Sequence, residues 1–294
     1  MEETEISRFS EAMVVIGNPQ SLANKKAAIR DAGPGKLQVI VDFDATLTRY
    51  WVNGLRGQSS HGLLQQSNPE FDAKRRQLFE YYHPLEFSPT IPIEEKTALM
   101  EEWWGKAHAL LIEGGVAYND IKKSVANATL EFRDGVVELF SFLEVLRQKL
   151  YKSFKNVKIV SNWMTFDNDG RLVSFRGKTI HVLNKNEHAI DMAAPLHDQL
   201  GGIDGPTDGN DSVKKRTNVL LLGDHLGDLG MSDGLNYENR ITVGFLNDNV
   251  EKSLEIYQKA FDVVFLNDAP MWGVVELVTE ICSTGAAGGK DSSA

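Results

Sequence analysis

The stretch Val39–Trp51 reads VIVDFDATLTRYW, and it decides how the rest of the chain is organised. The stretch begins within a short, β-branched and apolar run, LQVIV at 37–41, which is typical of a strand buried on both faces. Two aspartates, Asp42 and Asp44, follow this run directly. Alternate residues of an extended segment share one side, so both carboxylates can point at one spot. Because ligands of open α/β sheets bind beyond the carboxyl ends of the strands, we expect a functional site here.

The other apolar runs predict an α/β fold around this strand. They occur at 157–162 (VKIVSN), 218–224 (NVLLLGD), 240–245 (RITVGF) and 261–266 (FDVVFL). Helical patterns precede or separate them, beginning with a helical lead-in over residues 9–30. Strands that alternate with helices indicate a parallel sheet.

Residues 68–130 have a different character. Apolar residues recur there at helical spacing with polar faces between them, which predicts a helical insert of about sixty residues, the size of a small lid. A hairpin is expected around 167–170, where the sequence is DNDG. The composition of 201–217 indicates a loop, and that of 283–294 a disordered tail.

Composition excludes several classes of protein. The chain has 294 residues and a formal net charge of −10. The negative phosphates of nucleic acids and membrane surfaces would repel it, so we expect it to bind neither. Its single cysteine, Cys282, excludes an intramolecular disulfide and a cysteine-based zinc cluster. The N-terminus lacks an apolar signal segment, and no apolar run approaches a membrane span. We expect a cytoplasmic protein that acts as a monomer.

A second apolar run also ends in carboxylates. Asp224 follows NVLLLG directly, and Asp228 comes four residues later. Like charges held close together are costly unless a cation neutralises them or one is protonated. Carboxylate oxygens without His or Cys partners favour Mg²⁺ over zinc. An Asp-x-Asp on its own could be an exposed turn, but the second acidic strand end favours a metal site.

Six segments carry a resemblance to a known family. DFDATLTRY, SNWMTFDNDG, HVLNKNEHAI and LLLGDHLGDLGMSDG, with FEYYHPLEF and EEKTALMEEWW in the helical insert, resemble the cytosolic pyrimidine 5′-nucleotidases of the third cytosolic class. That family lies in the haloacid dehalogenase superfamily of phosphohydrolases. The resemblance implies an α/β fold, with a Rossmann-like parallel sheet core over 1–57 and 134–294 and an inserted helical cap over 58–133. It also implies Mg²⁺-dependent hydrolysis of nucleoside 5′-monophosphates.

The resemblance also assigns roles to the residues of the core. Asp42 would be the nucleophile that forms an aspartyl-phosphate, and Asp44 the general acid and then base. The Asp44 backbone carbonyl, with the Asp42 and Asp224 carboxylates, would hold Mg²⁺. Asp228 would orient metal-bound water or the phosphate-binding lysine. That lysine corresponds to Lys185, whose fixed positive charge would act on the transferring group.

In the cap, the resemblance implies substrate-binding residues. Glu86 aligns with an acidic residue that meets the base edge, where a carboxylate accepts from an exocyclic amine. Trp104 corresponds to an aromatic residue that stacks on the base, although the pair Trp103 and Trp104 could equally pack the helix. A cationic base such as 7-methylguanine stacks especially well on indole, so both pyrimidine and 7-methylguanosine nucleotides are candidates. His61 could line the same cleft.

One departure from the family pattern concerns the second catalytic motif. The family has an apolar strand followed by SAG, whose hydroxyl binds the phosphoryl oxygens. Here Glu144 runs straight into Val145, and no such strand stands between the flanking helical segments. In the expected strand order the missing strand lies beside the nucleophile strand. Ser161, at the end of VKIVSN, could replace the lost hydroxyl, but its segment matches a region after that motif and favours a structural role.

Three alternatives stay open at this point. A related phosphatase could act on sugar phosphates. A non-catalytic variant could bind nucleotides without turnover, since the chain without its second motif could be impaired. A phosphotransferase could pass the phosphoryl group to a nucleoside instead of water.

Overall fold

The computed structural model of the protein describes residues 13–64, 68–86, 88, 90–150, 160–186, 189 and 215–283, with only the backbone of 144–150. Contacts divide the chain into two compact units. The first contains Met1–Trp51, Glu131–Asn156 and Asp208–Ala294, and the second contains Val52–Leu130 and Val157–Thr207.

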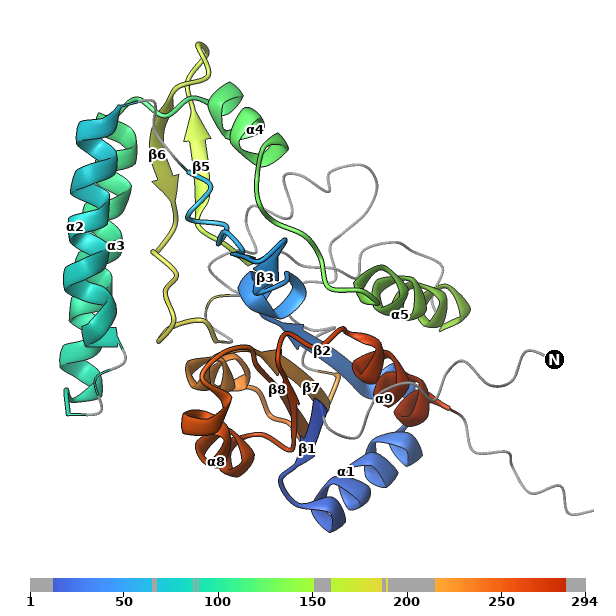
Figure 1. The fold of residues 1–294 in the computed structure, drawn as a ribbon. Helices are drawn as coiled ribbons and strands as arrows, with labels where there is room; N and C mark the ends of the chain where they lie inside the picture. The colour runs from blue at the N-terminus through green and yellow to red at the C-terminus, as the bar shows by residue number, and fades with distance from the viewer. Residues whose placement is uncertain are drawn as a thin grey trace, which may run out of the picture. The chain divides into compact units, whose positions relative to one another are not determined.

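The first unit is built on a five-stranded sheet with the order β1-β9-β8-β7-β2 (Figure 1). Strands β2, β7, β8 and β9 are parallel, and β1 pairs antiparallel with β9. The bounds are Val14–Ile16 for β1, Leu37–Val41 for β2, Asn218–Gly223 for β7, Asn239–Leu246 for β8 and Val263–Leu266 for β9. The four parallel strands confirm the prediction from the apolar runs around Val39 and at 218–224, 240–245 and 261–266. The helical lead-in expected over 9–30 needs a correction, because β1 occupies Val14–Ile16 and the helix begins only at Pro19.

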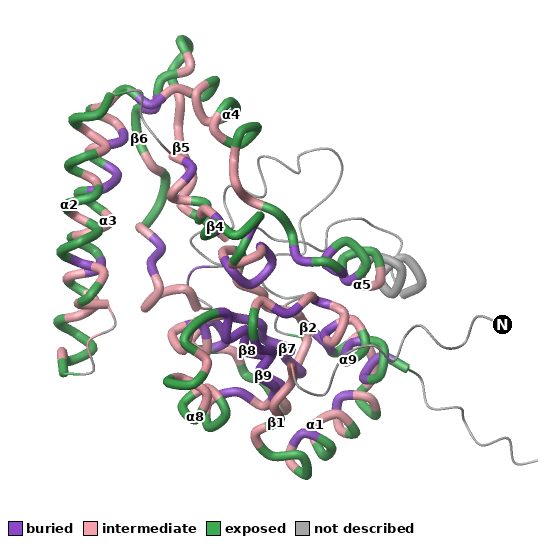
Figure 2. The backbone as a smooth tube through the Cα atoms, viewed as in Figure 1, coloured by how far each residue is buried: buried purple, intermediate pink, exposed green. Residues whose placement is uncertain are grey.

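Helices cover both faces of this sheet. They are α1 (Pro19–Ala32), α5 (Val136–Leu150), α8 (Val250–Ala260) and α9 (Trp272–Cys282), with a short 3-10 turn at Pro34–Lys36. Because side chains alternate along a strand, Val263 and Phe265 pack with α1, α5 and α9, while Val264 and Leu266 pack with α8. The strands β7, β8 and β9 are accordingly the most buried part of the unit (Figure 2). This arrangement is the doubly wound α/β core that the sequence predicts.

Strand β2 has a partner along one edge. It pairs with β7 over its full length, from Leu37 opposite Asn218 to Val41 opposite Leu222. No strand of the described chain pairs with its other edge. The expected strand VKIVSN falls partly outside the described residues, which resume at Val160, and Val160–Asn162 form no strand.

The second unit contains the predicted helical insert. Its helices are α2 (Pro69–Glu86), α3 (Ile93–Glu113) and α4 (Tyr118–Ala126), and a short hairpin of β3 (Trp51–Val52) and β4 (Leu55–Arg56) leads into it. No helix in the described ranges is long and apolar enough to cross a membrane.

The predicted hairpin around DNDG is present, but it belongs to the second unit. It consists of β5 (Trp163–Phe166) and β6 (Leu172–Arg176). Leu172 is buried with Leu111 and Val116 of the helical insert, and the Leu172 amide donates to the Val116 carbonyl at 2.8 Å. The expected core range of 134–294 therefore needs a correction, because the apolar side of this hairpin packs on the helices of the insert.

Candidate active site

The turn after β2 presents the first carboxylates. The Asp42 amide donates to the Leu222 carbonyl at 3.0 Å, which continues the β2–β7 ladder by one residue. Residues Phe43–Leu47 then form one irregular π-helical turn, in which Ala45 is buried and has a φ of 58°. The Ala45 amide donates to the Thr48 hydroxyl at 2.8 Å. This tight turn fixes the backbone on both sides of Asp44.

The end of β7 supplies the other carboxylates. Asp224 follows Gly223, and a 3-10 helix over Leu226–Ser232 begins with a reciprocal cap, in which the His225 amide donates to the Asp228 carboxylate at 3.0 Å. A Cβ on Gly223 would lie 2.5 Å from the Asp228 Cβ. Only glycine at the strand end lets Asp228 approach this closely.

Three of the predicted metal ligands come together. Oxygen atoms of Asp42, Asp224 and Asp228 all lie within 4.8 Å of one another, with Asp228 buried and the other two half-buried. Oxygens that share one Mg²⁺ at about 2.1 Å lie about 3–4.2 Å apart, so a small contraction would suit that ion. The donor set contains only carboxylate oxygens, which fits Mg²⁺ rather than zinc. The Asp44 side chain is half-buried and lies outside this cluster.

A half-buried tyrosine holds the backbone of this cluster. The Tyr257 hydroxyl of α8 donates to the Asp224 carbonyl at 2.7 Å. Burial raises the pKa of Tyr257, and the nearby carboxylates of Asp224 and Asp228 raise it further. The phenol therefore stays protonated and keeps its donor role at neutral pH. Sequence reasoning missed this residue, because nothing in the pattern of α8 distinguishes it from other half-buried aromatic residues.

Lys185, Glu86 and Trp104 all lie in the second unit. Lys185 is half-buried in the turn after Thr179, where the Asn184 side chain donates to the Thr179 carbonyl and accepts from the His181 amide. Glu86 is the last residue of α2 and is half-buried.

Trp104 of α3 lies in a row of rings that come from several segments. Its indole meets His61 edge-on at 4.9 Å between ring centroids and His108 at 5.7 Å. His108 in turn stacks on Phe175 at 3.7 Å. Burial lowers the pKa of His61 to about 4, helped by the charge of Arg75, and burial likewise lowers the pKa of His108 to about 4. Trp104 is thus set between neutral imidazoles, while the neighbouring Trp103 stacks on Tyr82.

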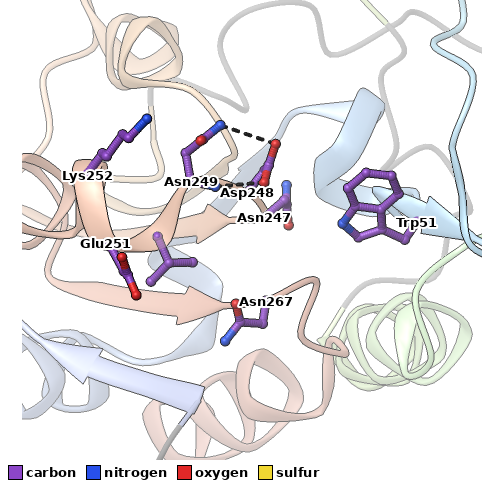
Figure 3. Close-up of a pocket in the computed structure, with 8 residues that line it drawn as sticks. Trp51, Asn247, Asp248, Asn249, Glu251, Lys252 and Asn267 are labelled. Atoms are coloured by element: carbon purple, nitrogen blue, oxygen red, sulfur yellow. Dashed lines mark hydrogen bonds between the residues drawn. The ribbon is translucent and has the colours of Figure 1, made fainter.

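A pocket of about 380 Å³ lies beyond the ends of β8 and β9 (Figure 3). Trp51, Asn247, Asn249 and Asn267 line it, with Val250 at the start of α8. Sequence reasoning did not anticipate it, although polar residues after two apolar strands were a signal for this edge of the sheet.

Comparisons with known proteins show the family to which the chain belongs. The family model described as Pyrimidine 5′-nucleotidase (UMPH-1) matches residues 45–145 and 141–282. The chain belongs to the pyrimidine 5′-nucleotidase family. The two matched ranges meet at 141–145, within α5, which is where the sequence lacks the expected second motif.

Individual members of the family cover most of the chain. It is 36% identical over 287 residues to 7-methylguanosine phosphate-specific 5′-nucleotidase A of Xenopus laevis, covering 89% of this chain and 94% of that protein. The human 7-methylguanosine phosphate-specific 5′-nucleotidase is 34% identical over 305 residues, with 96% of each chain covered. The structure of cytosolic 5′-nucleotidase IIIB bound to cytidine is similar with a TM-score of 0.75 and 26% identity, over 92% of this chain and 94% of that one. The chain is therefore a 5′-nucleotidase with a haloacid dehalogenase-type fold.

Proposed function

We propose that this chain hydrolyses nucleoside 5′-monophosphates with Mg²⁺, through an aspartyl-phosphate on Asp42. The observation that carries the proposal is the cluster of carboxylate oxygens from Asp42, Asp224 and Asp228 at the ends of two neighbouring parallel strands, in a member of this family. Mg²⁺, when bound by these residues and the Asp44 carbonyl, would neutralise charge between the nucleophile and the phosphate.

Each residue is given the role that the family resemblance implies for it. The Asp42 carboxylate attacks phosphorus as the bond to the 5′-oxygen breaks, and Asp44 gives its proton to that oxygen. Asp44, now ionised, then removes a proton from the water that attacks the aspartyl-phosphate. Lys185 supplies positive charge to the phosphoryl oxygens, and Asp228 orients water or this lysine.

The base is proposed to bind in the second unit. Trp104 would stack on it, and Glu86 would accept a hydrogen bond from its exocyclic amine. Two kinds of relative bear on its identity: several are named for 7-methylguanosine phosphate, and one solved structure holds cytidine. The indole, set between imidazoles held neutral by burial, favours a cationic base such as 7-methylguanine, while pyrimidine nucleotides stay candidates.

The second candidate function is a non-catalytic or impaired nucleotide-binding variant. The unpaired edge of β2 within the described chain favours it, because the missing motif would supply a hydroxyl and backbone amides to the phosphate. Ser161 is exposed and lies in the second unit. Nothing in the site selects a sugar phosphatase or a phosphotransferase.

The setting of the protein is also proposed. We place it in the cytoplasm as a monomer, without nucleic-acid or membrane partners. The cytosolic naming of a Caenorhabditis elegans relative and the buried free thiol of Cys282 support the cytoplasmic location.

A phosphate-release assay with CMP, UMP and 7-methyl-GMP, with and without Mg²⁺, tests the proposal. Mg²⁺-dependent release from nucleotides and much slower release from sugar phosphates is the expected result. Metal-dependent nucleotide binding without release would establish the non-catalytic variant. Transfer of the phosphoryl group to added nucleoside would identify a phosphotransferase.

A further inference from the structure

Arg133 is the largest fully buried side chain of the chain's described part, and it does not belong to the carboxylate cluster. In the sequence it lies between α4 and α5, in a segment that reads RDG and indicates only a break between helices. Its guanidinium makes hydrogen bonds to four groups and an ion pair with a fifth: the Thr46, Ala269 and Ala45 carbonyls at 2.8, 2.7 and 2.5 Å, the Asn247 side chain at 2.7 Å and the Asp268 carboxylate at 2.8 Å.

Two of these bonds go to the turn that directly follows Asp44. The carbonyl of Ala45 accepts from Arg133 and also from the Asn247 side chain, at 3.0 Å. Ala45 has a φ of 58°, a left-handed conformation that is unfavourable for a residue with a Cβ. Such a conformation persists where surrounding contacts determine it. The Arg133 guanidinium supplies two such contacts from outside the turn, to Ala45 and Thr46.

The same guanidinium also fixes the far end of the segment. Its ion-pair partner, Asp268, accepts from the backbone amides of Tyr50 and Trp51 at 2.7 and 3.0 Å. The Arg133 amide donates to the Leu47 carbonyl at 2.9 Å. Arg133 therefore ties together the segment that starts just after Asp44 and ends at Trp51.

The charge on Arg133 is retained at neutral pH. Burial lowers the pKa of Arg133 to about 10, and the carboxylates of Asp268 and Asp224 oppose this shift. The guanidinium also lies over the Phe245 ring at 4.5 Å. A lysine could keep the charge, but its single ammonium could not reach the three carbonyls that the guanidinium binds through Nε, Nη1 and Nη2.

We propose that Arg133 is a positioning residue that holds the turn after Asp44, so that the Asp44 carboxyl is aligned to protonate the leaving 5′-oxygen. This inference rests on the role proposed for Asp44. A residue that acts only on folding would slow all substrates equally. A residue that aligns the proton donor slows those substrates most whose leaving group needs the proton.

The test compares Arg133→Lys on two esters. A nucleoside 5′-oxygen is a poor leaving group that needs protonation, whereas the nitrophenolate of 4-nitrophenyl phosphate leaves without it. We expect kcat/KM for CMP to fall about 10²-fold more than kcat/KM for 4-nitrophenyl phosphate, since misplacing a catalytic group by about 1 Å has an effect of that size. The ratio kcat/KM reports the steps up to departure of the leaving group, so the later attack of water, which both esters share, does not enter the comparison. Hydrogen exchange in residues 43–51 should become about 10-fold faster or more, with β7 unchanged.

Two further variants separate positioning from stability. Val278→Ala removes buried volume from α9 away from the turn, so it should lower both activities equally and leave exchange in 43–51 unchanged. Asn247→Ser removes the second donor to the Ala45 carbonyl and should repeat the Arg133→Lys pattern in a weaker form. It also serves if Arg133→Lys does not fold.

Each outcome decides the proposal. Equal losses on both esters, or unchanged exchange in 43–51, overturn it. A parent protein that hydrolyses neither ester contradicts the proposed function instead. Exchange then decides the positioning of the turn alone, because that measurement needs no turnover.

Discussion

The two units of the chain offer different chemistry to a nucleotide. The first unit gathers charged groups at the ends of its parallel strands: the carboxylates of Asp42, Asp224 and Asp228, and behind them the buried Arg133. The second unit gathers rings, with Trp104 between His61 and His108. Charged groups can interact with the phosphate of any ester, whereas the aromatic rings can stack only on a substrate that has a base. Catalysis and selectivity should therefore be separable by mutation.

The largest effect is expected from Asp42→Asn. The amide has nearly the same shape but cannot readily form the acyl phosphate, so turnover should be abolished on every ester while the fold stays intact. Phosphate release and circular dichroism before and after heating would measure the two properties. Full activity in this variant would overturn the assignment of the nucleophile and with it the separation of roles.

Asp224→Ala tests the metal side of the first unit. One carboxylate ligand is removed, so the Mg²⁺ concentration for half-maximal rate should rise by at least about 10-fold on nucleotides and on 4-nitrophenyl phosphate alike. Titration of the rate with Mg²⁺ checks this. An unchanged metal dependence would remove Asp224 from the site.

Trp104→Ala tests the second unit. Loss of the indole should weaken nucleotide binding by about 1–3 kcal/mol, the usual contribution of one base–aromatic stack. A minimal phosphate ester should be hydrolysed as before. Trp103→Ala is the matched control, because Trp103 stacks on Tyr82 within the protein and its loss should mainly affect stability. If Trp104→Ala slows both kinds of substrate equally, the residue only packs the helix.

The smallest effect concerns pH and the second unit alone. Burial lowers the pKa of His61 and His108 from 6.5 to about 4, so between those values the unfolded chain binds more protons than the folded one. Stability should therefore fall as pH drops from 7 to 4, by about 1–2 kcal/mol for each histidine at pH 5. Urea unfolding at pH 7 and pH 5 should show a smaller decline in the free energy of unfolding for His108→Phe, whose ring can keep the stack on Phe175. An identical decline in the variant and the parent would mean that His108 is accessible to protons in the folded state.

Much of the fold, and the carboxylate cluster of the site, could be predicted from the sequence. Strands β2, β7, β8 and β9 follow from short apolar runs, and the carboxylate cluster follows from two such runs that end in aspartate. The helices of the insert follow from their apolar period. These features are local, so a pattern of neighbouring residues is enough to predict them.

Other features depend on distant residues and carry no local signal. Strand β1 has three residues and is stabilised by pairing with β9, far along the chain. The hairpin of β5 and β6 belongs to the second unit because Leu172 is buried against the insert, which its own sequence does not reveal. Arg133 binds backbone carbonyls and side chains from three separate segments, at 45–46, 247 and 268–269. An arginine between helices ordinarily suggests an exposed side chain.

The first unit also contains the feature that puts its activity at risk. Strand β2 is paired along one edge by β7, and in the described ranges its other edge has no partner. The paired edge brings the metal ligands together. The unpaired edge is where the second motif would place a hydroxyl and amides on the phosphate, and one such donor contributes a factor of about 10²–10³ in rate.

The most direct test compares this chain with a version in which an apolar strand and a Ser-Ala-Gly turn are inserted between Glu144 and Val145. Our account predicts that the chain as written hydrolyses CMP at least about 10²-fold more slowly than the restored version, which should also unfold at a higher temperature. Equal rates would contradict it, and a large loss in Ser161→Ala would then show that Ser161 has taken the place of the missing hydroxyl.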